Sequence, residues 1–245
     1  MRMRKKKRGH ERLEALSALV ITEPEKYREK GDFPFYEKLP LRLEIGCGKG
    51  DFICQLSERD KEYNYLAMER VEDVCVAATE KYARGRGLGE LDYHGGWRTP
   101  DGEIYKGEMW NIPMEMKGNV RFMPLDASRL EEYFAPETFE SIYANFSDPW
   151  TKNGYSQRRL THPDFLARYL KLLKPGGYFR FKTDNDELFE FSVESVESSD
   201  LELLYVTRDL HASDRADTNI VTEYEANFSS KGIPIKFLEA RKSIK

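Results

Sequence analysis

Short apolar segments rich in β-branched and aromatic residues alternate with longer amphipathic segments along this 245-residue chain. Such alternation is typical of an α/β domain, in which helices pack on a largely parallel sheet. We therefore expect one doubly wound, seven-stranded, mostly parallel sheet with helices on both faces. The predicted strands are 41–46, 63–68, 119–124, 140–146, 177–183, 202–208 and 234–240, and the predicted helices are 51–58, 71–84, 162–173, 186–197 and 222–228.

Two regions lie outside this alternation. Residues 1–38 are charged and interrupted by proline, so they are predicted to form a basic N-terminal arm and a leading helix, ahead of a single domain at 39–245. Residues 85–118 are rich in Gly and aromatic side chains, and Pro100-Asp101-Gly102 is typical of a turn between two short extended arms. We expect an inserted hairpin at this place in the domain.

The charge of the chain is unevenly distributed. Its 39 Lys+Arg and 43 Asp+Glu give a net charge of −4, which by itself counts against a basic nucleic-acid-binding domain. Residues 1–12, however, carry a net charge of +6 and residues 149–182 one of +7, which leaves −17 on the remainder. Two basic segments on an acidic body predict that an anion is bound at one place and repelled elsewhere.

The cysteines and the hydropathy pattern indicate where such a protein works. Cys47, Cys54 and Cys75 have spacings that fit no zinc site or disulfide framework, which is typical of a reduced, intracellular protein. No apolar run reaches the roughly 20 residues of a membrane span. We expect a soluble cytoplasmic protein with no membrane partner. The four histidines form no ligand cluster, so no metal is predicted.

The sharpest local signal is the segment LRLEIGCGKGDF, which runs from an apolar strand into an amphipathic helix through Gly46, Gly48 and Gly50. Glycine suits such a turn because it adopts positive φ and lets a ligand approach the backbone closely. Asp51 stands where a dinucleotide fingerprint has its third glycine, and Glu44 would repel a diphosphate. The loop therefore predicts a ligand site that does not hold a pyrophosphate.

Acidic residues stand at the ends of the first three predicted strands, at Glu44, Glu69 and Asp126. Carboxylates accept hydrogen bonds from hydroxyl and amino donors and attract cations. S-adenosylmethionine carries positive sulfonium and ammonium groups together with a ribose diol, so the three acids and the glycine loop predict it as the cofactor. Glu69 is assigned to the ribose hydroxyls and Asp126 to the adenine amino group.

Further candidates follow the later strands. In NFSDPW, Asp148 precedes a proline, so its backbone is expected to be extended and its carboxylate to project beside the cofactor. Lys152, Arg158 and Arg159 open the second basic segment and are candidates for contacts with RNA phosphates. The remaining polar candidates are Asp184 in TDND, and Thr222 and Glu225 in TEYEANF.

Together these motifs resemble those of the bacterial tRNA (guanine-N7-)-methyltransferases. The resemblance spans about 40–240 with a gap at 85–118, and it rests on EIGCGKG, NFSDPW, RRLTHPDFL, FKTDN, DLH and TEYE. NFSDPW and TEYE are specific to this family, whereas the glycine loop alone indicates only a methyltransferase. The resemblance implies a Rossmann-like class I methyltransferase fold, S-adenosylmethionine as donor, and methylation of N7 of guanine-46 in the variable loop of tRNA.

The resemblance also implies roles for individual residues. The cofactor-binding residues would be Glu44, Gly46, Gly48, Gly50, Glu69, Asp126 and Asp148. Asp148 would in addition be the catalytic residue. The substrate-binding residues would be Lys152, Asp184, Thr222 and Glu225, to which the charge pattern adds Arg158 and Arg159.

The chain departs from the family pattern in two places. Bacterial members commonly continue DPW with Pro-Lys-Lys-Arg-His, whereas residues 151–155 read TKNGY and keep one basic side chain, which weakens the expected tRNA contact there. The second departure is the inserted segment 85–118. Its aromatic residues form a small satellite core or, alternatively, a stacking surface for RNA; they are Tyr93, Trp97, Tyr105 and Trp110.

Two alternatives to a tRNA-modifying enzyme stay open. One is a class I methyltransferase that acts on another RNA or on a small molecule, and the other is a non-catalytic RNA-binding relative. The set of carboxylates favours an enzyme, because a protein that only binds RNA gains nothing from a cavity lined by acids. The expected partner is tRNA, bound by a monomer or homodimer through the basic arm and residues 152–159.

Overall fold

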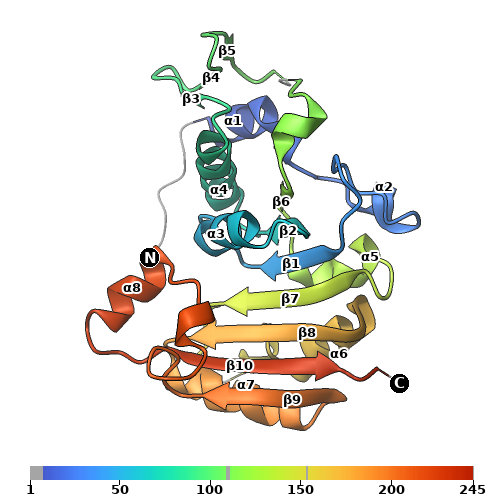
Figure 1. Cartoon of the computed structure of the whole chain (residues 1–245), viewed down its shortest axis with the longest axis vertical. Coiled ribbons are helices and arrows are strands. Elements are labelled where there is room, and N and C mark those ends of the chain that lie inside the picture. The colour runs from blue at the N-terminus through green and yellow to red at the C-terminus, as the bar shows by residue number, and fades with distance from the viewer. Residues whose placement is uncertain (1–7, 109–110, 153, 245) are drawn as a thin grey trace. The chain divides into compact units, whose positions relative to one another are not determined.

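The computed structural model describes residues 8–108, 111–152 and 154–244, so the tip of the basic arm, Trp110 and Asn153 lie outside the described residues. The chain divides into two compact units, the first formed by the chain up to Pro40 with Gly46–Ala127, and the second by Leu41–Ile45 with the chain from Ser128 onward. Among the described residues, seven strands belong to one mostly parallel sheet, which confirms the predicted α/β class (Figure 1).

The first unit holds two of these strands, β2 (Asn64–Met68) and β6 (Val120–Met123). They pair in parallel and are buried throughout, as expected for strands covered by helices. Contacts to them come from α3 (Asp51–Arg59) and α4 (Glu72–Gly85). The shorter elements of this unit are α1 (Gly9–Ala15), η1 (Ser17–Leu19), α2 (Glu25–Arg28) and η2 (Met114–Lys117).

Within its described residues, the segment predicted as an inserted hairpin contains three strands, one more than a hairpin has. Three short strands form an antiparallel sheet of their own, namely β3 (Glu90–Leu91), β4 (Trp97–Arg98) and β5 (Ile104–Tyr105). Trp97 is 1% exposed and donates from Nε1 to the carbonyl of Leu88 at 3.1 Å, so it forms the core of this small sheet. The two ends of the segment meet, because a Cβ added to Gly118 would lie 3.0 Å from Nε of Arg86.

The second unit holds the other five strands in the spatial order β1 (Leu41–Ile45), β7 (Phe139–Asn145), β8 (Leu173–Thr183), β10 (Lys236–Lys242) and β9 (Leu201–Thr207). The first three are parallel, and β10 runs antiparallel to both of its neighbours. The helices are α5 (Leu130–Tyr133), α6 (Pro163–Leu172), α7 (Asp186–Glu197) and α8 (Glu223–Ser229), with the 3-10 turns η4 (Ser156–Arg158) and η5 (Ala216–Thr218). A further 3-10 turn, η3 (Ala127–Arg129), begins at the last residue of the first unit and continues into the second.

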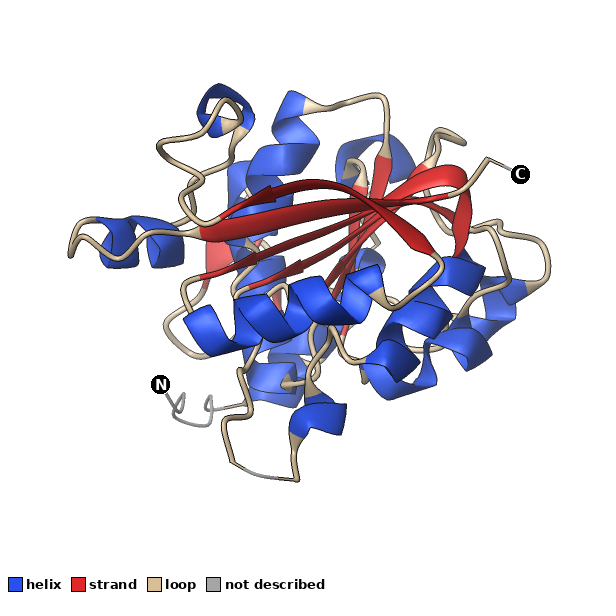
Figure 2. Ribbon diagram, turned by 90° about the horizontal axis from the view of Figure 1, so that it is seen from below, coloured by secondary structure: helices blue, strands red, loops and turns tan. Residues whose placement is uncertain are grey.

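Three helices described in the second unit, α6, α7 and α8, begin where the sequence supplies a suitable N-terminal residue. Asn185 accepts from the amide of Leu188 at the start of α7, and Thr222 accepts from the amide of Glu225 at the start of α8. α6 has Pro163 at its first position, where the missing N–H is not needed. Contacts of α7 with β8, β9 and β10 cover one face of these strands. Figure 2 shows the helices in blue and the strands in red.

The strand directions determine where the candidate residues lie. In the first unit, the parallel strands β2 and β6 end just before Glu69 and Asp126. In the second unit, β1, β7 and β8 are parallel, and Asp148 and Asp184 follow the ends of β7 and β8. Ligands of open α/β sheets bind at the carboxyl ends of the strands. Within the described residues, no helix is long and apolar enough to cross a membrane.

Candidate active site

The glycine loop of the first unit has the backbone conformation that its sequence predicts. Gly46, Gly48 and Gly50 have φ of 74°, 55° and 75°. The amides of Gly46 and Cys47 both donate to the carbonyl of Met68, at 2.8 and 2.9 Å, which ties the loop to the end of β2. A Cβ on Gly48 would have no atom within 4 Å, whereas one on Gly50 would lie 3.1 Å from Cβ of Ala78. Gly48 therefore leaves room for a ligand, and Gly50 allows the loop to pack on α4.

Glu69 is bonded across this loop. Its Oε2 accepts from the amide of Gly48 at 3.1 Å, and its Oε1 accepts from the amide of Val71 at 2.9 Å. These bonds fix the carboxylate beside the open space at Gly48. Carboxylate oxygens accept more than one hydrogen bond, so this arrangement suits the hydroxyl donors of a ribose. The first unit thus fits the sugar part of S-adenosylmethionine.

In the second unit, Asp148 is flanked by two strained residues. Phe146 and Trp150 have φ of 51° and 43°, in a region that L residues rarely adopt, and each such conformation costs about 1–3 kcal/mol. Strain of this kind tends to occur at functional sites. The Asp148 side chain itself is exposed, as expected for a residue that meets a ligand.

Tyr224 joins the two later acids into one cluster. Its hydroxyl donates to Oδ1 of Asp184 at 3.4 Å, and its ring packs against Phe146 and Phe228 with centroid separations of 4.8 and 4.6 Å. Burial, and then the charges of Asp184 and Asp148, raise the pKa of Tyr224 to about 12. An aromatic face with two carboxylates beside it is suited to a planar base that carries N–H donors.

Sequence reasoning did not single out Tyr224. The signal was present, since Tyr224 lies between Thr222 and Glu225 in the TEYE motif. Helical geometry gives it a different direction from Glu225, its neighbour in the chain, because successive side chains on a helix are about 100° apart. Tyr224 is accordingly 47% exposed, whereas Glu225 is fully buried.

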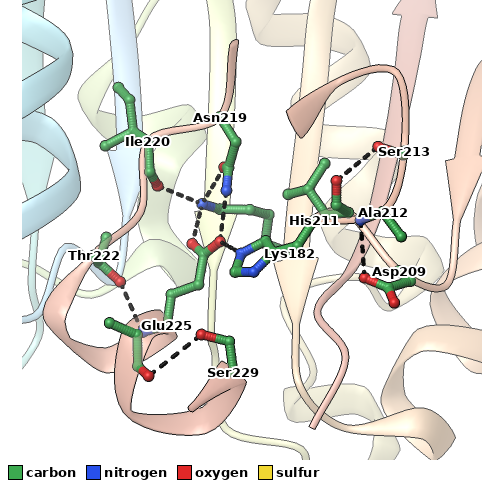
Figure 3. Close-up of polar contacts among 12 residues, drawn as sticks. Lys182, Asp209, His211, Ala212, Ser213, Asn219, Ile220, Thr222, Glu225 and Ser229 are labelled. Atoms are coloured by element: carbon green, nitrogen blue, oxygen red, sulfur yellow. Dashed lines mark hydrogen bonds and ion pairs between the residues drawn. The ribbon is translucent and has the colours of Figure 1, made fainter. Parts of the chain in front are cut away.

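Glu225 lies at the centre of a buried polar network (Figure 3). Its Oε2 accepts from Nζ of Lys182 at 2.6 Å, and its Oε1 contacts Nε2 of His211 and Nδ2 of Asn219, each at 2.6 Å. Lys182 also donates to Oδ1 of Asn219 and to the carbonyl of Ile220. The network holds the segment that contains DLH and TEYE against β8.

The charges of this network are strongly perturbed by their surroundings. Burial lowers the pKa of Lys182, although the adjacent Glu225 carboxylate opposes that change. Burial alone would raise the pKa of Glu225, but Lys182, His211 and Asn219 together bring it below its ordinary value. Attraction within the pair is thus largely offset by the removal of both charges from water.

The three basic candidates near Asp148 have different environments. Lys152 and Arg158 are exposed, and the guanidinium of Arg158 stacks on Tyr155 and Trp150 at 4.7 and 5.1 Å from their ring centroids. Arg159 is 6% exposed and donates from Nε to the carbonyl of Pro149 at 2.9 Å. Lys152 and Arg158 can therefore meet a polyanion, whereas Arg159 holds the loop in place.

Glu44 is also buried, at 2% exposed, within β1. Its Oε1 accepts from Nδ2 of Asn145 on the neighbouring strand β7 at 3.3 Å. The carboxylate also favours the charged form of Lys182, since it opposes the fall in the pKa of that side chain. Glu44 thus supplies negative charge at the carboxyl end of β1, immediately before the glycine loop.

These features define a class I methyltransferase. Two solved structures share the fold: an antibiotic-related methyltransferase, with a TM-score of 0.54 and 15% identity over 94% of this chain and 98% of that chain, and the 16S rRNA methyltransferase KamB, with a TM-score of 0.56 and 11% identity over 88% and 92%. A protein-family model described as "Putative methyltransferase" matches residues 38–238.

Relatives of much higher identity identify the particular family. The chain is 39% identical over 221 residues to the tRNA (guanine-N(7)-)-methyltransferase of Lachnoclostridium phytofermentans, covering 90% of this chain and 89% of the relative. It is 37% identical over 241 residues to the enzyme of the same name from Listeria welshimeri, covering 98% of each. The chain belongs to the family of tRNA (guanine-N7-)-methyltransferases, as its motifs predict.

Proposed function

We propose that this protein transfers a methyl group from S-adenosylmethionine to N7 of guanine-46 in the variable loop of tRNA. The observation that carries the proposal, together with family membership, is the cluster of Asp148, Asp184 and Tyr224 in the second unit. Its aromatic ring supports stacking of a base, and its two carboxylates can accept from the N1–H and N2 amino groups of guanine.

The cofactor supplies a methyl group bonded to a positively charged sulfur. Glu69, held by the amides of Gly48 and Val71, is assigned to the ribose hydroxyls. Asp126 is assigned to the adenine amino group. The glycine loop provides room for close approach at Gly48, while Gly46 and Gly50 shape its backbone. Glu44 and Asp148 complete the proposed set and supply negative charge for the cationic part of the cofactor.

The substrate residues divide by burial. Asp184 is assigned to the guanine edge, and the exposed Lys152 and Arg158 to phosphates. Arg159 contributes by fixing the loop after Asp148. Thr222 and Glu225 contribute by fixing the start of α8, since the Glu225 carboxylate would have to leave Lys182 before it could contact guanine.

Methylation of guanine N7 makes modest demands on the protein. N7 carries a free lone pair, so no proton has to be removed before it attacks, and orientation can supply roughly 7–11 kcal/mol. The product ring is positively charged. The Asp148 carboxylate is therefore assigned an orienting and electrostatic role as positive charge develops on the base. The base is engaged in folded tRNA and has to be exposed before it reaches the site.

The decisive assay combines labelled S-adenosylmethionine with unmodified tRNA, followed by borohydride reduction and aniline cleavage, which cuts the chain at N7-methylguanine. Cleavage at position 46 is expected, and a tRNA with adenine at that position should give none. Label incorporated elsewhere would instead support a methyltransferase with another RNA substrate. The absence of label from every RNA would support a non-catalytic relative.

The role of Asp148 is tested by comparison with Asp184. Asp148→Asn should lower turnover at saturating tRNA, because it removes the charge that stabilises the developing cation. Asp184→Asn should act mainly on KM for tRNA, because it alters an acceptor for the guanine edge. Near-normal turnover of Asp148→Asn, combined with loss of turnover in Asp184→Asn, would show that the two roles are assigned the wrong way round.

A further inference from the structure

The inserted sheet of the first unit has a buried tryptophan core and belongs to an acidic segment. Trp97 fills its core, and Asp92, whose carboxylate pairs with Arg98, accepts from the amide of His94 at 2.9 Å in the turn between β3 and β4. Four Lys/Arg and six Asp/Glu between 85 and 118 give the segment a net charge of −2. Such a segment is poorly suited to bind RNA phosphates through its own side chains.

The same turn supports the beginning of α1. Nη1 of Arg8 donates to the carbonyl of His94 at 2.8 Å, and a Cβ added to Gly95 would lie 3.3 Å from Cδ of Arg8. A Cβ added to Gly107 would lie 3.5 Å from Oε2 of Glu14, so the insertion also lies close to α1 six residues beyond Arg8. The start of α1 is therefore fixed by the insertion.

α1 is also attached to α4. Nε of Arg12 donates to Oε1 of Glu80 at 2.7 Å, and these side chains are only 11% and 4% exposed. A buried charge-assisted bond of this kind is directional and much less screened than a surface pair. α1 is thus held both by α4 and by the inserted sheet.

We infer that the inserted sheet is a positioning element for the basic arm. Residues 1–8 contain six Lys/Arg and no acid, and Arg8 is where this segment joins α1. By holding Arg8 against the turn at His94 and Gly95, the insertion fixes the residue at which the basic arm joins α1, and the basic side chains of the arm bind phosphates of tRNA. This inference rests on the proposed function and adds to it a role for a segment that the family motifs do not include.

Two matched glycine variants test the inference. Gly95→Val disturbs the turn that contacts Arg8 without changing the charge of the protein. Gly102→Val is the control, because Gly102 has a similar φ, +93° against +91° at Gly95, but a Cβ at Gly102 would have no atom within 4 Å. Gly95→Val should raise KM for tRNA by about threefold to tenfold and reduce the slope of log KM against log salt by about one, as for one or two lost phosphate contacts. Gly102→Val should change neither quantity.

Removal of residues 1–7 provides the second half of the test. This truncation should itself raise KM and reduce the salt slope, and Gly95→Val should add nothing in the truncated protein, because the insertion acts only through the arm. Additive effects would overturn the inference. An increase in KM for Tyr93→Ala would also overturn it, since Tyr93 is fully exposed on the same turn and would then be stacking on RNA directly.

Folding and function are controlled separately. Each variant is compared with the parent by thermal unfolding, and Arg8→Ala provides a second way to break the contact with the His94 carbonyl if Gly95→Val does not fold. KM and the salt slope are read from the transfer of labelled methyl to tRNA. A parent protein that methylates no tRNA would refute the proposed function itself, whereas an active parent with unchanged Gly95→Val and Arg8→Ala variants would refute only the positioning role.

Discussion

The buried pair of Lys182 and Glu225 allows a quantitative prediction. Their side chains are 3% and 0% exposed, with Nζ and Oε2 2.6 Å apart. Lys182→Met would leave the carboxylate buried without its charge partner, and removal of one partner of a buried pair costs about 3–5 kcal/mol. For a chain of this size, each kcal/mol lowers Tm by about 2–4 °C, so we expect Tm to fall by about 6–20 °C.

Denaturant unfolding followed by circular dichroism measures the change in the free energy of unfolding, and thermal unfolding measures Tm. The matched control is Arg208→Met, which breaks an exposed pair with Glu190 whose side chains are 62% and 49% exposed. Because water screens such pairs, the control should leave Tm unchanged within error.

The double variant Lys182→Met/Glu225→Gln separates the charge effect from the loss of packing. Removal of both charges should be less destabilising than removal of Lys182 alone, with a coupling energy of about 2 kcal/mol in a double-mutant cycle. Additive single effects, or a Lys182→Met variant with the stability of the parent, would refute the reasoning that this pair is held together against a large desolvation cost.

Three further outcomes are expected. Glu69→Gln should raise the Kd for S-adenosylmethionine by about tenfold or more in calorimetry, because a charge-assisted hydrogen bond is worth about 1.5–3 kcal/mol; unchanged affinity would exclude the ribose assignment. Gly50→Ala should lower the free energy of unfolding by more than Gly232→Ala does. The two glycines have nearly the same φ, +75° at Gly50 and +74° at Gly232, but a Cβ at Gly232 would have no atom within 4 Å; equal losses of stability would show that contact with α4 is unimportant. The pKa of Glu225 is lower in the folded protein than in the unfolded chain, where it is about 4.3. The ionised carboxylate therefore stabilises the fold above that pH, and this contribution is lost as pH falls through the folded pKa. Denaturant unfolding between pH 3 and 7, with and without Glu225→Gln, measures the loss.

The sequence predicted the strands and helices well because their patterns are local. The glycine loop, for example, lies between β1 and α3 as expected, and its positive φ angles follow from the need to turn sharply after a buried strand. The observed end of a strand differs from the predicted one where pairing with a neighbouring strand determines it. β8 begins at Leu173 rather than at 177, since Leu173 already pairs with Phe139 before a register shift.

The candidate site was predicted less completely, because the contacts that shape it are not local. Lys182 and Glu225 are 43 residues apart, and nothing in the sequence pattern indicates that the Glu225 carboxylate forms its bonds inside the protein. Burial of Arg159 depends in the same way on Pro149 and on Phe191, whose ring lies 4.6 Å from the guanidinium. The left-handed backbone of Phe146 and Trp150 has no local signal either, since neither residue is glycine.

The adjacent ends of the inserted segment have a consequence for protein engineering. The chain departs near Arg86 and rejoins beside Tyr82, whose hydroxyl accepts from the amide of Val120 at 3.2 Å where β6 begins. A foreign domain whose own termini are close together can be accommodated at such a place without separating α4 from β6. The turn at Pro100–Gly102, exposed at the far end of the segment, is accordingly suitable for carrying a fluorescent reporter of tRNA binding.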